Sequence, residues 1–266
     1  MIINPYIYSV ATSYDPDAQL FFNAQTTAGV TLTTTQMNAV NQWVVDSKAA
    51  NIWTKFKAVY PMVGGSPTSH KFNLKNPLDT DAAFRLVFSG GWTHSSTGML
   101  PNGTNAYANT FFNPSAITNN NHISYYSRTN VAEDRLEIGT IALAGQSFSI
   151  AFRAIGNTYN AGNHLTASFI STANTSSLGL AINTRTTSTN FKVYVNNLLK
   201  ATNTTAGTSA ISFNIYLGAR NNNNVAELFS SKQCAFASIG DGLSDAEALA
   251  FYNAVNAFQV SLGRNV

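Results

Sequence analysis

The 266-residue sequence has little charge and almost no cysteine. Asp, Glu, Lys and Arg make up only 10% of it, against roughly 25% in ordinary soluble domains. The net charge of +3 is spread along the chain without a Lys/Arg cluster, which argues against the basic stripe that nucleic-acid binding requires. The single cysteine, Cys234, excludes an intrachain disulfide framework and a cysteine-based metal site. Its alternating surroundings, "CAFASI", predict a buried and inert thiol.

Long apolar segments are also missing. No run approaches the roughly 20 apolar residues of a membrane span, so we expect no membrane insertion. The first residues, "MIINPYIYSV", lack the basic flank and the long apolar core of a secretory signal. Asn, Thr and Ser supply the polarity that charge does not, and these residues favour turns and strand edges. A polar, nearly neutral surface of this kind suits extracellular and virion proteins.

The sequence begins with a helical lead-in. Asp15 can cap a helix of one or two turns in "YDPDAQLFFNAQ", with Pro16 at its first position. The stretch around Trp43, "TTQMNAVNQWVVDSKAANIW", has apolar residues at helical spacing and predicts a second helix. These helices are too short and too polar to fold alone. We therefore expect residues 1–52 to form an attachment layer that packs on residues 53–266.

From Phe56 onward the pattern changes to short runs rich in Phe, Tyr, Val and Ile, such as "FRLVFSGGW", "SFSIAFRAI" and "FKVYVNN". Loops of Asn, Gly, Ser and Thr separate them. Many closely spaced strands without intervening helical patterns predict an antiparallel sandwich or barrel. Asn196 and Asn197 are expected to form a two-residue hairpin turn, because Asn tolerates positive φ.

The chain closes with an amphipathic helix, predicted over residues 244–262. Ser244 and Glu247 have the spacing of a capping box, and Gly263 supplies the C-terminal stop. The expected apolar face, which must dock on the sandwich, consists of Leu249, Tyr252, Val255 and Phe258, flanked by Phe251 and Leu262.

The late strands and this helix resemble the laminin-G-like, concanavalin-A-like jelly roll. The resemblance rests on "FSIAFRAI", "FKVYVNN", "FNIYLGARNNN" and "AFASIGDGLSDAEALAFY", because in that superfamily a late "YLGA"-type strand precedes a turn into a short helix. It implies an all-β fold, an antiparallel jelly-roll sandwich with a small N-terminal helical layer and a docked C-terminal helix.

A second resemblance spans roughly Trp53 to Val266. "FNLKNPLDTDAAFRLVFSGGWTHSSTGMLPNGTNAYANTFFNPS", "HISYYSRTN" and "LSDAEALAFYNAVNAFQVSLGR" are similar to a family of virion proteins of tailed bacteriophages, common in phages of Bacteroidetes hosts, including crAss-like phages. This resemblance implies a non-enzymatic structural component of a phage virion, in capsid decoration, a head or neck fibre, or the tail. Other virion proteins would be its partners, and fibre and decoration proteins are often homo-oligomers.

The few acidic residues offer little enzyme chemistry. Alternation along "VAEDRLEIG" places Glu133, Arg135 and Glu137 on one strand face and Asp134 on the other. Retaining glycosidases need two carboxyl groups roughly 5 Å apart across a sugar. With an arginine between the two glutamates, we expect a solvated, Arg-neutralised strand end and no glycosidase. Asp79 and Asp81 suit a cap-and-turn role, with a Ca²⁺ site as the alternative.

The histidines lie in separate segments without metal-ligand spacing, so we expect no metal and no cofactor. The alternative function is a host-glycan-binding adsorption module on the same fold. Sugar sites use exposed aromatic rings with Asn, Asp and Arg hydrogen-bonding groups. Of Tyr125 and Tyr126, one must face the core, and its neighbour faces outward unless another layer covers it. The candidate glycan contacts, on the concave sheet or its loops, are Trp92, His94, Tyr126, Arg128, Tyr159 and Asn160.

Overall fold

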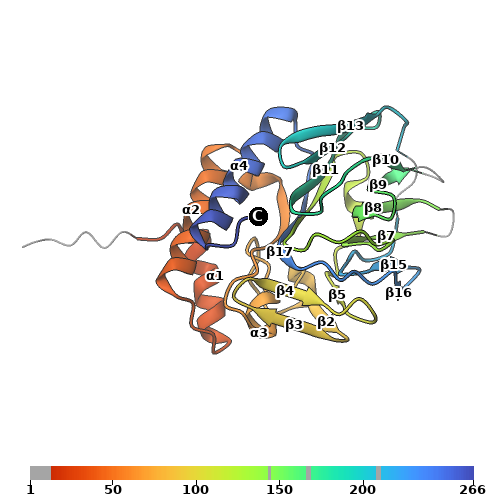
Figure 1. Cartoon of the computed structure of the whole chain (residues 1–266). Helices are drawn as coiled ribbons and strands as arrows, with labels where there is room; N and C mark the ends of the chain where they lie inside the picture. Colours follow the sequence, from red (N-terminus) through yellow and green to blue (C-terminus); the bar gives the residue numbers. More distant parts are fainter. Residues whose placement is uncertain (1–12, 143–144, 166–168, 208–210) are drawn as a thin grey trace, which may run out of the picture.

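The computed structural model describes residues 13–142, 145–165, 169–207 and 211–266. Two β-sheets lie face to face, and three helices cover the outer side of one of them (Figure 1). We call the helix-covered sheet A and the other sheet B. The expected jelly-roll sandwich with helices at both ends of the chain is confirmed.

Sheet A carries the helices. β1 (Phe56–Tyr60) and β4 (Gly98–Pro101) both pair with one side of β17 (Cys234–Gly240), and β6 (Asn121–Ser127) pairs with its other side. In spatial order, sheet A contains β13 (Leu198–Asn203), β12 (Asn190–Val195), β11 (Gly179–Thr187), β6 (Asn121–Ser127), β17 (Cys234–Gly240), β4 (Gly98–Pro101) and β3 (Trp92–Ser95).

Sheet B forms the opposite layer. β15 (Arg220–Asn222) pairs with β16 (Val225–Glu227) and, in parallel, with β7; all other pairs between named strands are antiparallel. In spatial order, sheet B contains β10 (Ile170–Ala173), β9 (Thr158–Leu165), β8 (Ser147–Ala154), β7 (Ile138–Ile141), β14 (Tyr216–Leu217), β5 (Tyr107–Asn109) and β2 (Val87–Ser89).

The helices begin where the sequence has capping residues. Asp15 accepts a hydrogen bond from the backbone N–H of Asp17, and Thr33 forms a capping box with Gln36. The first helix runs for 12 residues, longer than the one or two turns expected. The long helices are α1 (Pro16–Thr27), α2 (Thr34–Ala49) and α4 (Asp245–Ser261), and the short ones are η1 (Trp53–Lys55), α3 (Pro67–His70), η2 (Asp81–Ala83) and η3 (Pro114–Ile117).

Two hydrophobic cores result from this arrangement. One fills the space between the sheets, where Tyr125 of β6 lies with Phe148 of β8. The other lies between sheet A and the helices, where Tyr126 of β6 joins Trp43 of α2 and Phe251 of α4. Both faces of sheet A are therefore buried, and the lead-in helices pack on the sandwich as expected.

Helix α4 has the predicted capping box, in which the side chains of Ser244 and Glu247 each hydrogen-bond to the other residue's backbone N–H. The prediction of its apolar face was wrong in part. Phe251, Val255 and Phe258 are buried, whereas Leu249 is 41% exposed. The buried stripe is centred on the Phe251 side of the helix, and it includes Ala248 and Ala254. The small alanines let α4 lie close to its neighbours, so the large side chains alone did not define the docking face.

The C-terminal residues fasten this helix to sheet A. Gly263 has a φ of +64°, the left-handed conformation of a helix stop. Arg264 turns inward and is buried, donating hydrogen bonds to the carbonyl oxygens of Pro61 (2.7 Å), Met62 (2.7 Å) and Ala235 (2.9 Å). A guanidinium can meet several carbonyls at once because it has five donors in a fixed plane.

The hairpin turn between β12 and β13 was also predicted correctly. Asn196 and Asn197 both have positive φ, 46° and 65°. Asn223 and Asn224 adopt the same conformation between β15 and β16.

Candidate functional site

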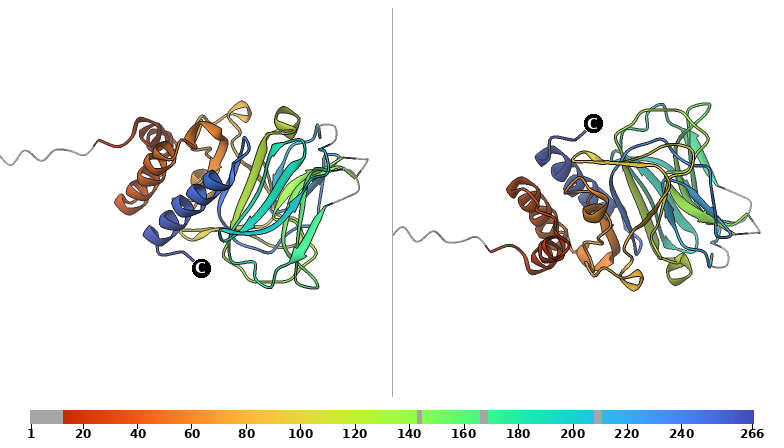
Figure 2. Two further views of the ribbon diagram at one scale, coloured as in Figure 1. Left: turned by 90° about the horizontal axis from the view of Figure 1, so that it is seen from above. Right: turned by 90° about the horizontal axis from the view of Figure 1, so that it is seen from below.

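Among the described residues, no helix covers the outer face of sheet B, in contrast to that of sheet A (Figure 2). Alternation along β8 sends Phe148 and Ile150 into the core between the sheets. It sends Ser147, Ser149 and Ala151 outward, where they line a groove of about 380 Å³. Ligand pockets in proteins commonly have volumes of about 300–1,000 Å³, so this groove is large enough for a small ligand.

Small side chains make the floor of the groove. Ser149 of β8 lies opposite Gly162 of β9 in the strand register. A Cβ atom on Gly162 would lie 1.9 Å from Oγ of Ser147, so no larger residue fits there without displacing its neighbour. Because these side chains are small, a ligand lying on the floor would come close to the backbone of β8 and β9.

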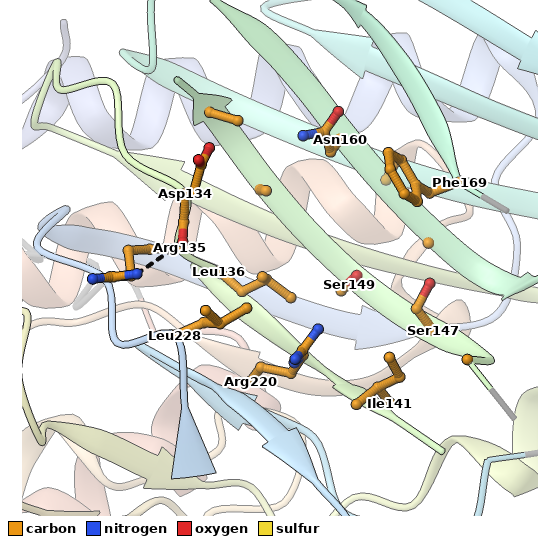
Figure 3. A pocket seen from close by; sticks show the side chains of 15 residues that line it. Asp134, Arg135, Leu136, Ile141, Ser147, Ser149, Asn160, Phe169, Arg220 and Leu228 are labelled. Carbon is orange, nitrogen blue, oxygen red and sulfur yellow. Dashed lines mark hydrogen bonds between the residues drawn. The ribbon is translucent and has the colours of Figure 1, made fainter. Parts of the chain in front are cut away.

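Larger side chains form two walls along this floor (Figure 3). Asn160 and Phe169 stand on one side, and Leu136, Leu228 and Arg220 on the other. Phe169 is 59% exposed, although a free phenyl ring in solvent is unfavourable unless something covers it. The amide oxygen of Asn160 is buried and has no hydrogen-bond partner in the described part of the chain.

Charged groups complete the lining. Arg220 donates through Nε to Oε1 of Glu227 at 2.7 Å, and its Nη2 forms an ion pair with the same oxygen. Asp134 and Arg135 lie at one end of the groove (Figure 3). Oδ1 of Asp134 accepts the backbone N–H of Ile155 at 2.9 Å, which fixes the carboxylate at the rim.

Of the six residues predicted to contact a glycan, the structure places only Asn160 in this groove. Tyr159 is fully buried in the core between the sheets, where its hydroxyl donates to Oδ1 of Asn183 at 2.6 Å. Tyr126 is 2% exposed because the helices and the C-terminal residues form the additional layer that would cover it. Its hydroxyl accepts the backbone N–H of Val266 at 3.0 Å.

The other three predicted residues also have structural contacts. Nε of Arg128 donates to the carbonyl oxygen of Arg264 at 2.8 Å. Trp92 packs against the core between the sheets and donates through Nε1 to the carbonyl oxygen of Tyr107 at 3.1 Å. The Nδ1 atoms of His94 and His70 lie 2.9 Å apart. The six residues therefore do not form one site.

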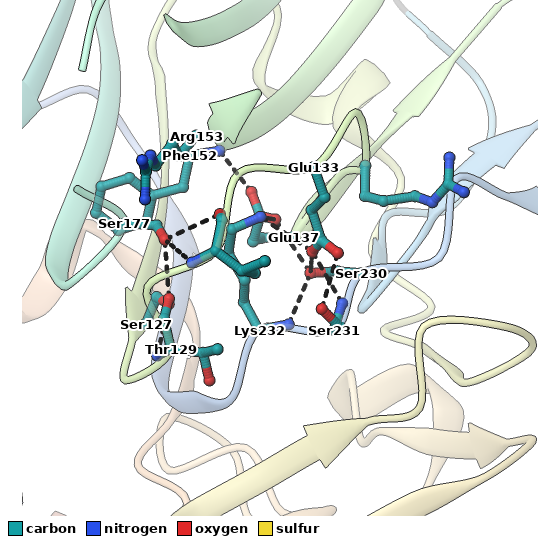
Figure 4. Close-up of polar contacts among 12 residues, drawn as sticks. Ser127, Thr129, Glu133, Glu137, Phe152, Arg153, Ser177, Ser230, Ser231 and Lys232 are labelled. Atoms are coloured by element: carbon teal, nitrogen blue, oxygen red, sulfur yellow. Dashed lines mark hydrogen bonds and ion pairs between the residues drawn. The ribbon is translucent and has the colours of Figure 1, made fainter. Parts of the chain in front are cut away.

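Glu133 and Glu137 share a side of the chain, as alternation predicted, but the expectation of an Arg-neutralised, solvated end was wrong (Figure 4). Their partner is Lys232, whose Nζ lies 3.0 Å from Oε1 of Glu133 and 2.9 Å from Oε1 of Glu137. Lys232 and Glu137 are both fully buried.

Further hydrogen bonds complete this buried network. The backbone N–H of Phe152 donates to Oε2 of Glu137, and Oγ of Ser230 donates to Oε1 at 3.0 Å. With its carboxylates occupied in this way, the network ties β7, β8 and the segment before β17 together. It offers no open space for a sugar between the two glutamates.

The remaining reactive groups have structural surroundings too. Burial raises the pKa of the Cys234 thiol to about 12, which leaves it the inert thiol expected. A hydrogen bond from Lys71 lowers the pKa of Asp79, and Arg85 pairs with both Asp79 and Asp81. Within the described ranges, no cluster of three or more His, Cys, Asp or Glu side chains could hold a metal ion. No helix there is both long and apolar enough to span a membrane.

The groove residues that sequence reasoning missed are Phe169 and Arg220. A signal was available in "SFSIAFRAI", where large residues alternate with serine and alanine. That pattern marks a strand with one buried face and one face bare enough to form a floor. The two wall residues come from distant segments, and only the folded sheet brings them beside β8.

No protein-family model matches the chain, and no curated protein is significantly similar to it in sequence. Among solved structures, domain 4 of AbnA, an extracellular GH43 arabinanase from Geobacillus stearothermophilus solved in complex with arabinotriose, is similar. That likeness covers 74% of this chain and 98% of that domain, with a TM-score of 0.51 and 12% identity. Botulinum neurotoxin type C, whose cell entry depends on interaction with two ganglioside molecules, is similar over 78% of this chain.

The toxin match has a TM-score of 0.50 and 14% identity and covers 53% of that chain, so this protein spans about half of it. Likeness at such low identity concerns the fold, and it agrees with the two antiparallel sheets described above. The chain is a jelly-roll β-sandwich similar in fold to these two structures.

Proposed function

We propose that this chain is a non-enzymatic carbohydrate-binding module that holds an oligosaccharide in the groove on the outer face of sheet B. The observation that carries the proposal is the pairing of an exposed ring, Phe169, with the unpartnered amide oxygen of Asn160 on one wall of a low floor. The similar arabinanase domain was solved with arabinotriose, which supports a saccharide as the class of ligand.

The chemistry of the groove suits a sugar. A pyranose or furanose ring has one face of C–H groups and a rim of hydroxyls, so it needs an apolar surface beside hydrogen-bonding groups. Phe169 and Leu228 supply apolar surface, while Asn160, Ser149 and Arg220 supply donors and acceptors. Binding sites generally combine a mostly apolar lining with a few placed polar groups.

The proposal is tested on an array of bacterial surface and plant polysaccharides, with Kd values then measured by calorimetry. We expect saturable binding by the native chain and about fivefold weaker binding by Phe169→Ala, because an aromatic contact contributes on the order of 1 kcal/mol. Asn160→Ala should weaken the same interaction.

Val225→Ala is the matched control. Val225 is 64% exposed on β16 and does not line the groove, so its loss should leave binding unchanged. Absence of binding to every saccharide on the array would overturn the proposal. Equal affinity of the native chain and the Phe169→Ala variant would show that any binding occurs elsewhere.

The virion setting remains a prediction from the sequence resemblance. We propose that the module acts on a phage particle, as part of capsid decoration, a fibre or the tail, with other virion proteins and further copies of itself as partners. Purified particles should then contain the chain in a fixed ratio to the capsid protein by mass spectrometry. Its absence from particles would contradict this setting without affecting the groove.

A further inference from the structure

Charged side chains gather in the lining of the groove. It contains two guanidinium groups, from Arg135 and Arg220, and one carboxylate, from Asp134. In a chain with only 10% charged residues, two arginines at one groove are a local concentration. The site has no net charge once Glu227, the partner of Arg220, is counted, so any selectivity must come from how the individual groups are placed.

Arg220 occupies the middle of its wall, and its guanidinium points toward the floor (Figure 3). Both Nε and Nη2 of Arg220 donate hydrogen bonds to the same carboxylate oxygen, Oε1 of Glu227. Nη1 has no hydrogen-bond partner among the residues that the structure describes. The side chain is 25% exposed, so the ion pair holds it in place while one edge of the guanidinium stays available.

Arg135 carries the second positive charge. Its Nη1 donates to the carbonyl oxygen of Asp134 at 3.1 Å, and within the described residues it forms no ion pair with a carboxylate. The Asp134 carboxylate, by contrast, already accepts the N–H of Ile155. Figure 3 shows the guanidinium of Arg135 directed away from the floor, so an anionic ligand on the floor would meet the guanidinium of Arg220.

We infer that the groove selects acidic saccharides, in which a carboxylate on the sugar ring is bound by the guanidinium of Arg220. This inference rests on the proposed function. Guanidinium–carboxylate hydrogen bonds are short and among the stronger ones in proteins. A guanidinium already held by Glu227 loses little conformational freedom on binding. A ring packed on Phe169 would present its substituents across the floor to Arg220.

The test uses bacterial capsular and exopolysaccharide fragments that contain uronic acids, each in native form and after chemical reduction of its carboxylates to alcohols. Reduction keeps the linkages and length and removes only the charge. We expect the native chain to bind the acidic form at least about tenfold more tightly, because charged hydrogen bonds are worth about 1.5–3 kcal/mol. The preference should shrink with added salt.

Variants assign the preference to Arg220. Arg220→Gln combined with Glu227→Gln removes the guanidinium and keeps the net charge, and it should reduce the preference to less than about threefold. Lys57→Gln with Asp241→Asn is the matched control, since that pair (2.8 Å) joins β1 of sheet A to the segment after β17. Arg135→Gln changes an exposed side chain without a carboxylate partner in the described residues and should give a smaller loss.

The outcomes are distinct. Equal binding of acidic and reduced fragments, still weakened by Phe169→Ala, would overturn this inference and leave the proposed function intact. An acidic preference that survives in the Arg220→Gln, Glu227→Gln variant would overturn the assignment to Arg220. Absence of binding to either form of every fragment, together with an empty array, would contradict both proposals.

Discussion

The two outer faces of the sandwich differ, although both belong to sheets built mainly of antiparallel strand pairs. The outer face of sheet A presents Tyr126, Ile182 and Phe236, and helices bury all three. The outer face of sheet B presents Ser149 and Gly162 along its centre, and an open groove lies there. Side-chain size at alternate strand positions thus decides which face a helical layer covers, because burial of apolar area stabilises that docking.

The covered face also uses polar groups that the open face does not. Arg264 and Tyr126 bind backbone groups of the C-terminal residues and of the segment after β1. Because these side chains already hydrogen-bond to the backbone, they are not free to bind a ligand. Substitutions on the covered face should therefore change stability, and substitutions on the open face should change binding.

The largest effect is expected for Phe251→Ala on the covered face. Phe251 is fully buried, with ring centroids 5.1 Å from Phe56 and 6.0 Å from Phe236. Truncating a buried Phe costs about 3–5 kcal/mol of unfolding free energy. Urea denaturation should show a lower midpoint with an unchanged m-value. Affinity at the groove, measured where the variant is folded, should not change.

A loss of less than about 1 kcal/mol for Phe251→Ala would contradict the docked helix. It would mean that α4 contributes little to the stability of sheet A, and the comparison of the two faces would fail on its covered side.

Acid should destabilise the covered face next. His122 lies between sheet A and the helices, with Nε2 3.0 Å from Oγ of Ser238. Burial lowers its pKa to about 4, whereas an unfolded histidine has a pKa of about 6.5. Below about pH 6.5 the unfolded chain binds a proton that the folded chain refuses. Stability is therefore present above pH 6.5 and falls toward pH 4, by about 1.4 kcal/mol per pH unit for this group.

Burial also lowers the pKa of His70 to about 3 and of His164 to about 4, so the slopes add. The urea midpoint of the native chain should decline steadily from pH 7.5 to pH 4. The midpoint of the His122→Gln variant should decline less steeply over the same range. Equal slopes for both proteins would show that His122 titrates normally when folded. No histidine lies among the described residues that line the groove.

Much of this architecture could be predicted from local signals. Ser244 and Glu247 define the start of α4 through contacts only three residues apart, and Asn196–Asn197 defines a hairpin through its own backbone preference. The alternation in "SFSIAFRAI" gave β8 its two faces. Each of these features depends on neighbours in the sequence, and periodicity records such neighbours directly.

The groove and the buried network depended on distant partners. Lys232 lies 95 residues after Glu137, so no local pattern identifies it as the counter-ion. Local alternation instead favours Arg135, which is nearer in the sequence. Tyr126 could be placed on the outer side of sheet A, but only the docked helices decide that it is covered. Phe169 and Arg220 likewise meet the same floor only after β7, β8 and β10 have assembled.

The smallest effect on stability is expected for Phe169→Ala on the open face, in direct contrast to Phe251→Ala. Phe169 is 59% exposed, and exposed substitutions usually change the unfolding free energy by less than about 0.5 kcal/mol. Its urea midpoint should therefore match that of the native chain, while its Kd for the saccharide rises several-fold. If Phe169→Ala were instead destabilising by more than about 1 kcal/mol, the ring would be part of the fold. An exposed phenylalanine that contributes nothing to folding but is required for binding is the signature that distinguishes the open face as a recognition surface.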